Sequence, residues 1–168
     1  MVLHCGRVQA IEATSQHTAS LGDDGSVVLS DNDGITVYTL RCDAGWCGVK
    51  FTQARSLATV SCSGKLQLRS LSTLPPRAAE SDVAWPCRLD IDVESGGGRC
   101  TAFDIIEATV GGGGAAVLAI GQVGADGNIP SDVTAVVVDL TFKVAVAKYR
   151  APSAAITRIA FATGDWTL

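Results

Sequence analysis

The chain contains a hairpin pattern that occurs twice at regular spacing, and this repeat limits the possible folds more than any other feature. Residues 17–31 and 56–70 each begin with small and apolar residues, turn at a glycine, and return as an alternating strand. The turn glycines, Gly25 and Gly64, are 39 residues apart. Glycine readily adopts the positive φ that a tight hairpin turn requires. A period of about 40 residues built from short strands predicts an all-β repeat architecture.

The rest of the chain supports two further copies of this unit. Apolar segments of a third copy lie at 100–105, 115–121 and 133–140, with a turn at Asp126 and Gly127. A fourth copy starts at 156–161, and residues 166–168 open its second strand. First strands are expected at 8–11 and 47–51, and outer fourth strands at 35–40, 85–93 and 142–149.

Four short antiparallel strands in about 40 residues are typical of a β-propeller blade. The predicted blades cover residues 4–44, 45–95, 99–150 and, incompletely, 154–168. A closed propeller has 4–8 blades, and seven blades of about 40 residues need roughly 280 residues. The chain has 168. We therefore expect residues 1–168 to form part of a larger propeller, either a fragment or a ring that another chain completes.

Composition and charge exclude several classes of protein. The chain is 47% hydrophobic and 18% charged, which is too apolar for a disordered tail. A net charge of -4 gives no basic surface for direct binding of nucleic acid. The longest apolar stretch, 133–147, is interrupted by Asp139 and Lys143 and is shorter than the roughly 20 residues that cross a bilayer. No hydrophobic signal segment precedes His4, so neither a membrane span nor secretion is expected.

Cysteine and histidine spacing predicts no metal site. The six cysteines form no C-x-x-C pair, and His4 and His17 are the only histidines. We expect the cysteines to be reduced and to act as small core residues, and His17 to be a surface residue at a strand end. Asp90, Asp92 and Glu94 alternate with apolar residues, which favours the solvated face of an edge strand over a calcium loop.

One glycine-rich segment resembles a nucleotide-binding motif. Gly111, Gly113 and Ala116 fit the spacing G-x-G-x-x-A, which requires a helix directly after the glycines. Gly121 and Pro130 would break such a helix, so a loop between strands is favoured. A small nucleotide-dependent enzyme stays the least favoured hypothesis. No nucleophile elbow G-x-S-x-G is present, and we predict no catalytic, cofactor-binding or metal-binding residues.

The first hairpin resembles the WD40 repeat, in which a small-residue strand and an Asp-Gly turn precede a strand that ends in Trp-Asp. Asp31 and Asp139 stand at the terminal aspartate, whereas Ser30 and Val138 replace the tryptophan. The second repeat ends in Arg69-Ser70 instead. His4 resembles the histidine that opens many WD40 blades. The resemblance implies a buried network, for which this chain offers His4, Ser20 and Asp24. The predicted structural WD-repeat positions are His4, Ser20, Asp24, Gly25, Asp31, Gly64, Asp126, Gly127 and Asp139.

The order of motifs is also similar to that of the WD40 nucleoporins in the Y-shaped outer-ring complex of the nuclear pore. The similar segments are Cys5-Gly-Arg-Val8, Asp24-Gly25, Val49-Lys-Phe51 and residues 57–66, followed by the third blade. This resemblance implies a non-catalytic scaffold subunit at the nuclear envelope that contacts other Y-complex nucleoporins and supports nucleocytoplasmic transport. The alternative is a WD40 adaptor of another assembly, cytoplasmic in location, such as a ubiquitin-ligase substrate receptor or a ciliary or trafficking complex.

Overall fold

The structure, a computed structural model, describes residues 4–43, 45–75, 84–93, 98–107, 113–121, 133–150, 156 and 158–161. These residues form β-strands almost throughout, with one 3₁₀ turn, η1 (Leu71–Thr73), and no other helix in the described ranges. The expected all-β class is therefore confirmed. The strands are β1 (Val8–Ala13), β2 (His17–Gly22), β3 (Ser26–Asp31), β4 (Thr36–Arg41), β5 (Trp46–Phe51), β6 (Ser56–Ser61), β7 (Lys65–Ser70), β8 (Leu89–Asp92), β9 (Arg99–Glu107), β10 (Gly114–Gly121), β11 (Val133–Asp139) and β12 (Val144–Arg150).

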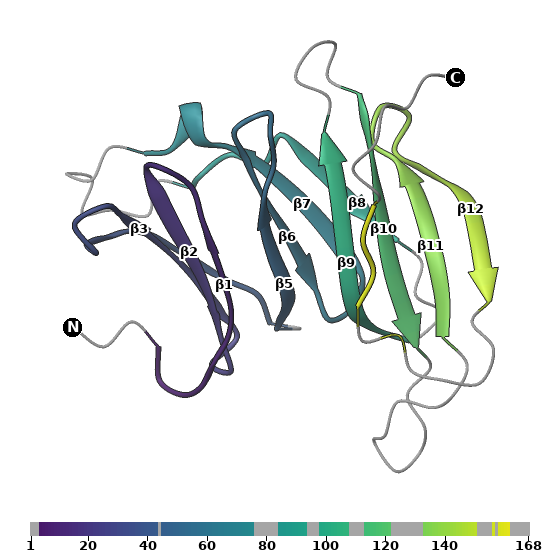
Figure 1. Cartoon of the computed structure of the whole chain (residues 1–168), viewed down its shortest axis with the longest axis horizontal. Helices are drawn as coiled ribbons and strands as arrows, with labels where there is room; N and C mark the ends of the chain where they lie inside the picture. Colours follow the sequence, from purple (N-terminus) through teal and green to yellow (C-terminus); the bar gives the residue numbers. More distant parts are fainter. Residues whose placement is uncertain are drawn as a thin grey trace.

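The strands make three four-stranded antiparallel sheets, each a simple meander. Their orders are β1-β2-β3-β4, β5-β6-β7-β8 and β9-β10-β11-β12, and we call them blades 1, 2 and 3. The blades follow one another side by side, with β1, β5 and β9 as the first strand of each (Figure 1). No helix in the described part of the chain is long and apolar enough to cross a bilayer.

The predicted hairpins form because glycine occupies their turns and because apolar and polar side chains alternate along their strands. Gly25 has φ 71° and Gly64 has φ 88°, in the left-handed region that favours glycine. In β7, Leu66 and Leu68 are fully buried, whereas the alternating polar residues are partly exposed. β6 lies between two neighbours of its own sheet and between two other blades, and all its residues are buried.

Two hydrophobic clusters hold the blades together. One lies between blades 1 and 2 and includes Leu21, Leu29, Trp46 and Leu57. The other lies between blades 2 and 3 and contains fifteen buried residues, Leu118 among them. Burying a leucine fully contributes about 2 kcal/mol, so these interfaces stabilise the packing of each blade against the next.

The first strand of each blade carries a β-bulge at the same place. The register shifts between Val8 and Ala10 in blade 1 and between Trp46 and Gly48 in blade 2. In blade 3 the shift skips Thr101. A bulge leaves one residue without a partner in the neighbouring strand, and these residues are Gln9, Cys47 and Thr101.

Two strand predictions were wrong at their ends. The outer strand expected over 85–93 is limited to β8, because Pro86 has no N–H for the sheet. Trp85 packs between blades 1 and 2 instead: its ring lies 5.5 Å from that of Tyr38, and its indole N–H donates to the Ser70 carbonyl at 3.0 Å. Phe142, expected to open the last outer strand, lies in the turn before β12 and is 75% exposed.

The predicted first strand of a fourth blade, 156–161, forms no strand among its described residues. Those residues nevertheless run along β9 (Figure 1). The Thr101 hydroxyl donates to the Ile156 carbonyl at 3.0 Å, and the Phe161 N–H donates to Asp104 at 2.6 Å. Residues 166–168, where a second strand was expected, lie outside the described part of the chain.

Candidate functional site

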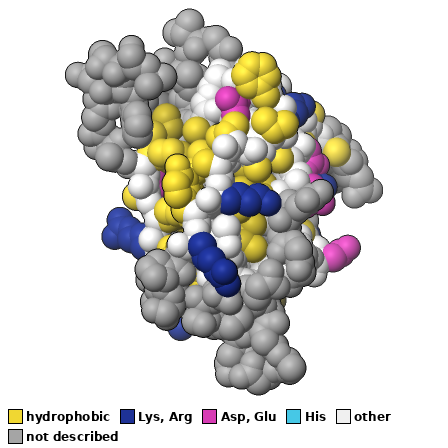
Figure 2. All heavy atoms as spheres, turned by 90° about the vertical axis from the view of Figure 1, so that its right-hand side faces the viewer, with side chains coloured by type: hydrophobic (Ala, Val, Ile, Leu, Met, Phe, Trp, Pro, Cys, Tyr) yellow, Lys and Arg dark blue, Asp and Glu magenta, His cyan; other side chains and the backbone are white. Residues whose placement is uncertain are grey.

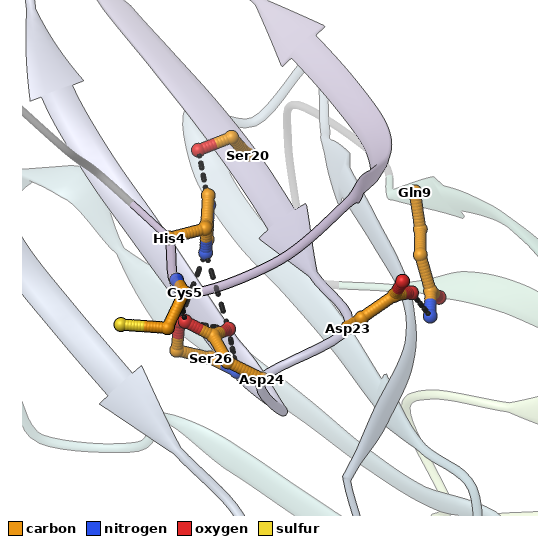
Figure 3. A network of polar contacts seen from close by, with 7 residues as sticks. All are labelled: His4, Cys5, Gln9, Ser20, Asp23, Asp24 and Ser26. Carbon is orange, nitrogen blue, oxygen red and sulfur yellow. Dashed lines mark hydrogen bonds and ion pairs between the residues drawn. The ribbon is translucent and has the colours of Figure 1, made fainter.

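The most extensive polar network in the described residues joins the segment before β1 to the β2–β3 hairpin (Figure 3). His4 is buried, with 7% of its surface exposed. Its Nε2 lies 2.8 Å from the Ser20 Oγ, and its Nδ1 lies 3.0 Å from the Ser26 Oγ and 3.2 Å from the Asp24 Oδ1. The structure thus brings together the three residues that the WD40 resemblance implies, and Ser26 joins them.

Asp24 is the centre of this network. Its Oδ1 accepts a hydrogen bond from the Ser26 hydroxyl at 2.7 Å, and its Oδ2 accepts one from the Cys5 N–H at 3.0 Å. These two bonds hold the pKa of the Asp24 carboxyl well below its ordinary value. Gly22 lets the groups approach, because a Cβ there would lie 2.4 Å from the His4 Nδ1. The network therefore fixes the N-terminal segment against the hairpin of blade 1.

Serine, histidine and aspartate also form the catalytic triad of many hydrolases. Here Ser20 lies inside β2 and pairs with Ile11 on one side and Val28 on the other. Its strand therefore supplies no free backbone N–H groups to stabilise an oxyanion. The geometry fits a structural network.

Within the described residues, blade 1 alone carries this network. Counted from the bulge, the position of Ser20 is taken by Thr59 in β6 and by Leu118 in β10. Thr59 is completely buried, and its hydroxyl has no hydrogen-bond partner among the described atoms. The three blades therefore share their backbone geometry, but the side chains of the network occur in blade 1 alone among the described residues.

The residue that ends the third strand of each blade caps the following turn with its side-chain oxygen. The Asp31 Oδ1 accepts from the Ile35 N–H at 2.8 Å, and the Asp139 Oδ1 accepts from the Thr141 N–H at 2.7 Å. In blade 2, Ser70 takes this place and accepts from the Ser72 N–H at 3.3 Å. Short polar side chains favour such turns because they satisfy free N–H groups locally.

Other sequence interpretations can be placed against the structure. Asp126, Gly127, Gly111 and Gly112 lie outside the described residues. Gly114 begins strand β10, which also contains Ala116, so the helix required by the nucleotide motif is not formed there. Among the described histidines, cysteines, aspartates and glutamates, no group is arranged to hold a metal ion.

Three further expectations concern exposure. His17 does lie at a strand end, but it is half-buried, because β2 is the second strand of its sheet. Asp90 and Asp92 are exposed, as expected of a solvated strand face, and Asp90 pairs with Lys65 at 3.1 Å. All six cysteines are free, but they are not uniformly core residues: Cys100 is buried and Cys5 is exposed.

Sequence reasoning missed two buried carboxylates at the first strand of blade 3. Asp104 forms an ion pair with Lys50 of β5, and Glu107 forms one with Arg88 and accepts from the Thr52 hydroxyl at 2.6 Å. Both acids are at most 5% exposed. Their only signal in the sequence is the presence of acids in an otherwise apolar strand.

Asp104 and Lys50 also line a groove of about 240 Å³ between the first strands. Glu12 and Arg158 are its other charged residues. The groove is therefore a polar surface at which the three blades and the 158–161 segment meet.

We expect a pH-dependent test of the Asp24 network to separate charge from packing. Because the pKa of Asp24 is lowered in the folded state from its ordinary 3.8, its stabilising contribution is complete above that pH. The contribution is lost as the pH falls through the folded-state pKa. Asp24→Asn should therefore be less stable than the wild type at pH 7, and the difference should shrink at pH 2–3.

Urea unfolding at a series of pH values measures this difference. Asp33→Asn is the matched control, because Asp33 is an exposed turn residue beside the same hairpin. Parallel pH profiles for the wild type and Asp24→Asn would contradict the assignment.

Comparison with known proteins shows which solved structures share this fold. No protein-family model matches the chain, and no curated protein matches it either. The C-terminal WD40 domain of Sif2 superposes with a TM-score of 0.65 at 14% identity over 95% of this chain. The β-propeller domain of Cps50 (Swd1) from Myceliophteria thermophila superposes with a TM-score of 0.60 at 13% identity over 92%.

The fold is that of a WD40 β-propeller. At 13–14% identity the likeness establishes the fold alone. The chain spans 41% of the Sif2 domain structure and 46% of the Cps50 structure. The described blades thus correspond to part of such a propeller, and the WD40 fold expected from the sequence is confirmed.

Proposed function

We propose that this chain is a non-catalytic scaffold that binds other proteins through the outer strand of blade 3. WD40 propellers are rigid frameworks whose exposed loops and edges carry function. The observation that carries the proposal is the exposed apolar surface on β12 and the turn before it.

We call this surface the rim patch and define it as Phe142, Val144, Val146 and Tyr149. Their exposed fractions are 75%, 49%, 59% and 63%. Hydrophobic side chains gather on this side of the molecule, with Lys and Arg side chains among them (Figure 2). Exposed apolar residues that lie together mark sites of protein interaction more often than isolated ones do.

The outer strands of the other blades differ from β12. In β8 the apolar residues point inward, and the exposed positions are Asp90 and Asp92. In β4 the exposed residues are Thr39 and Arg41. Edge strands are commonly protected by charge against unwanted pairing. β12 also exposes Lys148 and Arg150, but it is the outer strand with exposed apolar side chains, so it is the one best suited to a partner.

Affinity purification with quantitative mass spectrometry tests this proposal. We expect Val146→Asp and Tyr149→Asp to reduce specific partners about tenfold, since each places a charge in a desolvated contact. Thr39→Asp is the matched control, because it adds the same charge to an exposed position of β4. If both kinds of variant retain the same partners as the wild type, the rim patch is not the binding surface.

We further propose that the assembly is the outer ring of the nuclear pore. This narrower proposal rests on the similarity in motif order to the WD-repeat nucleoporin forty-three. It places the chain at the nuclear envelope with Y-complex nucleoporins as partners. An adaptor role in another assembly, such as a ubiquitin ligase or a trafficking complex, fits the fold equally well. Enrichment of Y-complex subunits in the same purification supports the nuclear pore, and their absence alongside another defined complex rejects it.

A further inference from the structure

The outer strand of blade 3 is exposed on both of its faces. Six of the 7 residues of β12 are exposed, and the other, Ala147, is half-buried. By contrast, the outer strand β8 buries Leu89 and Ile91, and the outer strand β4 buries Leu40. An outer strand normally covers its own blade on one face, so β12 leaves an apolar face open that its counterparts bury.

The register of blade 3 shows which side chains of β12 point toward blade 2. Ala145 is opposite Val138, and Lys148 is opposite Val136. Directly opposed residues of an antiparallel pair lie on the same face of the sheet, and both valines belong to the hydrophobic cluster between blades 2 and 3. Ala145 and Lys148 therefore face blade 2 but stay exposed, because the 4 residues of β8 do not cover the 7 residues of β12.

A cleft of about 220 Å³ lies between these two outer strands, and we call it the rim cleft. Its apolar lining comes from Ile91 and Val93 of blade 2 and from Val138, Val144 and Ala145 of blade 3. The volume is below the roughly 300 Å³ at which pockets for small molecules begin. The rim cleft therefore suits one or two side chains of a longer ligand better than a whole small molecule.

The charge of the rim cleft favours an acidic ligand. Lys143 and Lys148 line it, and neither forms an ion pair with another described residue. Asp92, the acid among its described lining residues, lies directly opposite Lys65 in the sheet of blade 2, which offsets its charge. β12 itself contains no acidic residue. The β12 side of the cleft is therefore positively charged.

The position of the cleft at a sheet edge favours a peptide in extended conformation. Among the described strands, β12 is the last of its sheet and pairs with β11 alone. An extended peptide can add to such an edge through backbone hydrogen bonds. Successive side chains of an extended peptide point in opposite directions. Apolar side chains can thus enter the cleft while acidic ones stay at its rim, within reach of Lys143 and Lys148.

We propose that the rim cleft binds an extended peptide of a partner protein in which large apolar residues alternate with acidic ones. The apolar side chains fill the space between β8 and β12, and the carboxylates pair with Lys143 and Lys148. The peptide is the part of the partner that contacts β12, so this proposal rests on the proposed function. It adds which face of β12 is used and which chemistry the partner presents.

Fluorescence anisotropy with the purified full chain tests the proposal. The probes are three fluorescein-labelled peptides of equal length, in which leucine alternates with aspartate, with serine or with lysine. We expect the aspartate peptide to bind at least about tenfold more tightly than the serine peptide, and the lysine peptide to bind most weakly. Added salt should weaken the aspartate peptide, because the lysines are exposed. Equal affinity for the aspartate and serine peptides, or no binding of the aspartate peptide, overturns the proposal.

Two cleft variants have matched controls on β4. Reversing both charges with Lys143→Glu and Lys148→Glu should weaken the aspartate peptide at least about tenfold, whereas Arg41→Glu, at an exposed position of β4, should not. Ala145→Phe fills the cleft and should block binding, whereas Thr39→Phe adds the same side chain to an exposed position of β4. Wild-type affinity in either cleft variant overturns the proposal.

These outcomes differ from those that test the proposed function. If Val146→Asp and Tyr149→Asp lose cellular partners but the cleft variants bind the aspartate peptide normally, the rim cleft is rejected and the rim patch is kept. If the cleft variants lose the peptide but Val146→Asp and Tyr149→Asp keep all partners, the rim patch is rejected instead. Light scattering detects a different occupant: a dimer that Ala145→Phe dissociates would assign the cleft to a second copy of the chain and overturn the proposal.

Discussion

Replacing Asp104 by asparagine is expected to lower the free energy of unfolding by about 3 kcal/mol, because it removes the charge of a buried carboxylate that joins separate parts of the chain. The side chain of Asp104 is 7% exposed and is paired with Lys50 of blade 2. Its second oxygen accepts from the Phe161 N–H at 2.6 Å. Asparagine keeps the volume but not the charge, and its amide presents a donor where the carboxylate had an acceptor.

The matched control is Asp90→Asn, which removes an acid from an exposed ion pair. Lys65 and Asp90 have side chains that are 44% and 43% exposed, and water screens their attraction. Asp90→Asn should therefore change the free energy of unfolding by less than about 1 kcal/mol. Urea unfolding followed by tryptophan fluorescence and circular dichroism compares the two variants.

Hydrogen exchange adds a local measurement. The amide of Phe161 should exchange faster in Asp104→Asn than in the wild type, because it loses its acceptor. Equal stability of Asp104→Asn and Asp90→Asn, together with unchanged exchange at Phe161, would show that Asp104 does not join these parts.

The hairpins were predictable because local chemistry determines them. A glycine turn between alternating strands specifies where the chain reverses and which side chains face inward, and β2–β3 and β6–β7 match the expected ranges. The capping role of Asp31 and Asp139 is local as well, although the sequence showed only that they occupy equivalent positions. Ser70 performs the same role with a different residue type, so similarity to a motif alone could not identify it.

The contacts between blades were not predictable for a physical reason. Asp104 and Lys50 are 54 residues apart, and their pairing depends on how two sheets pack. The register shift in β5 is a further feature of this kind, because no residue type in that strand indicates a bulge. For the candidate site, resemblance indicated His4, Ser20 and Asp24, but the contribution of Ser26 follows only from the shape of the turn.

Gly114→Ala is expected to lower the free energy of unfolding by about 4 kcal/mol, the largest effect among these predictions. Gly114 has φ +155°, a conformation that other residues rarely adopt. A Cβ at this position would lie 2.4 Å from the Ile106 carbonyl oxygen and 2.9 Å from the Glu107 Cα. Both are backbone atoms of β9, which is paired with β10, so neither can move without breaking the sheet.

Gly113→Ala is the control, because it lies one residue earlier in the same glycine run. A Cβ there would approach the Thr141 hydroxyl to 3.3 Å, and this side chain can turn away. The change should cost less than about 1 kcal/mol. Urea unfolding of both variants ranks their stabilities. If Gly114→Ala does not fold, the soluble yields of the two variants are compared instead.

The ranking also separates the two interpretations of the glycine run. A strand that starts against β9 requires glycine at position 114 and tolerates alanine at 113, whether or not any ligand is present. A phosphate-binding turn requires glycine where the backbone approaches the pyrophosphate, which in this spacing is Gly113, and its loss would leave the free protein stable. If Gly113→Ala lowered the free energy of unfolding as much as Gly114→Ala does, the strand geometry would be contradicted. A large cost at 114 alone means that close packing between β9 and β10 explains this glycine.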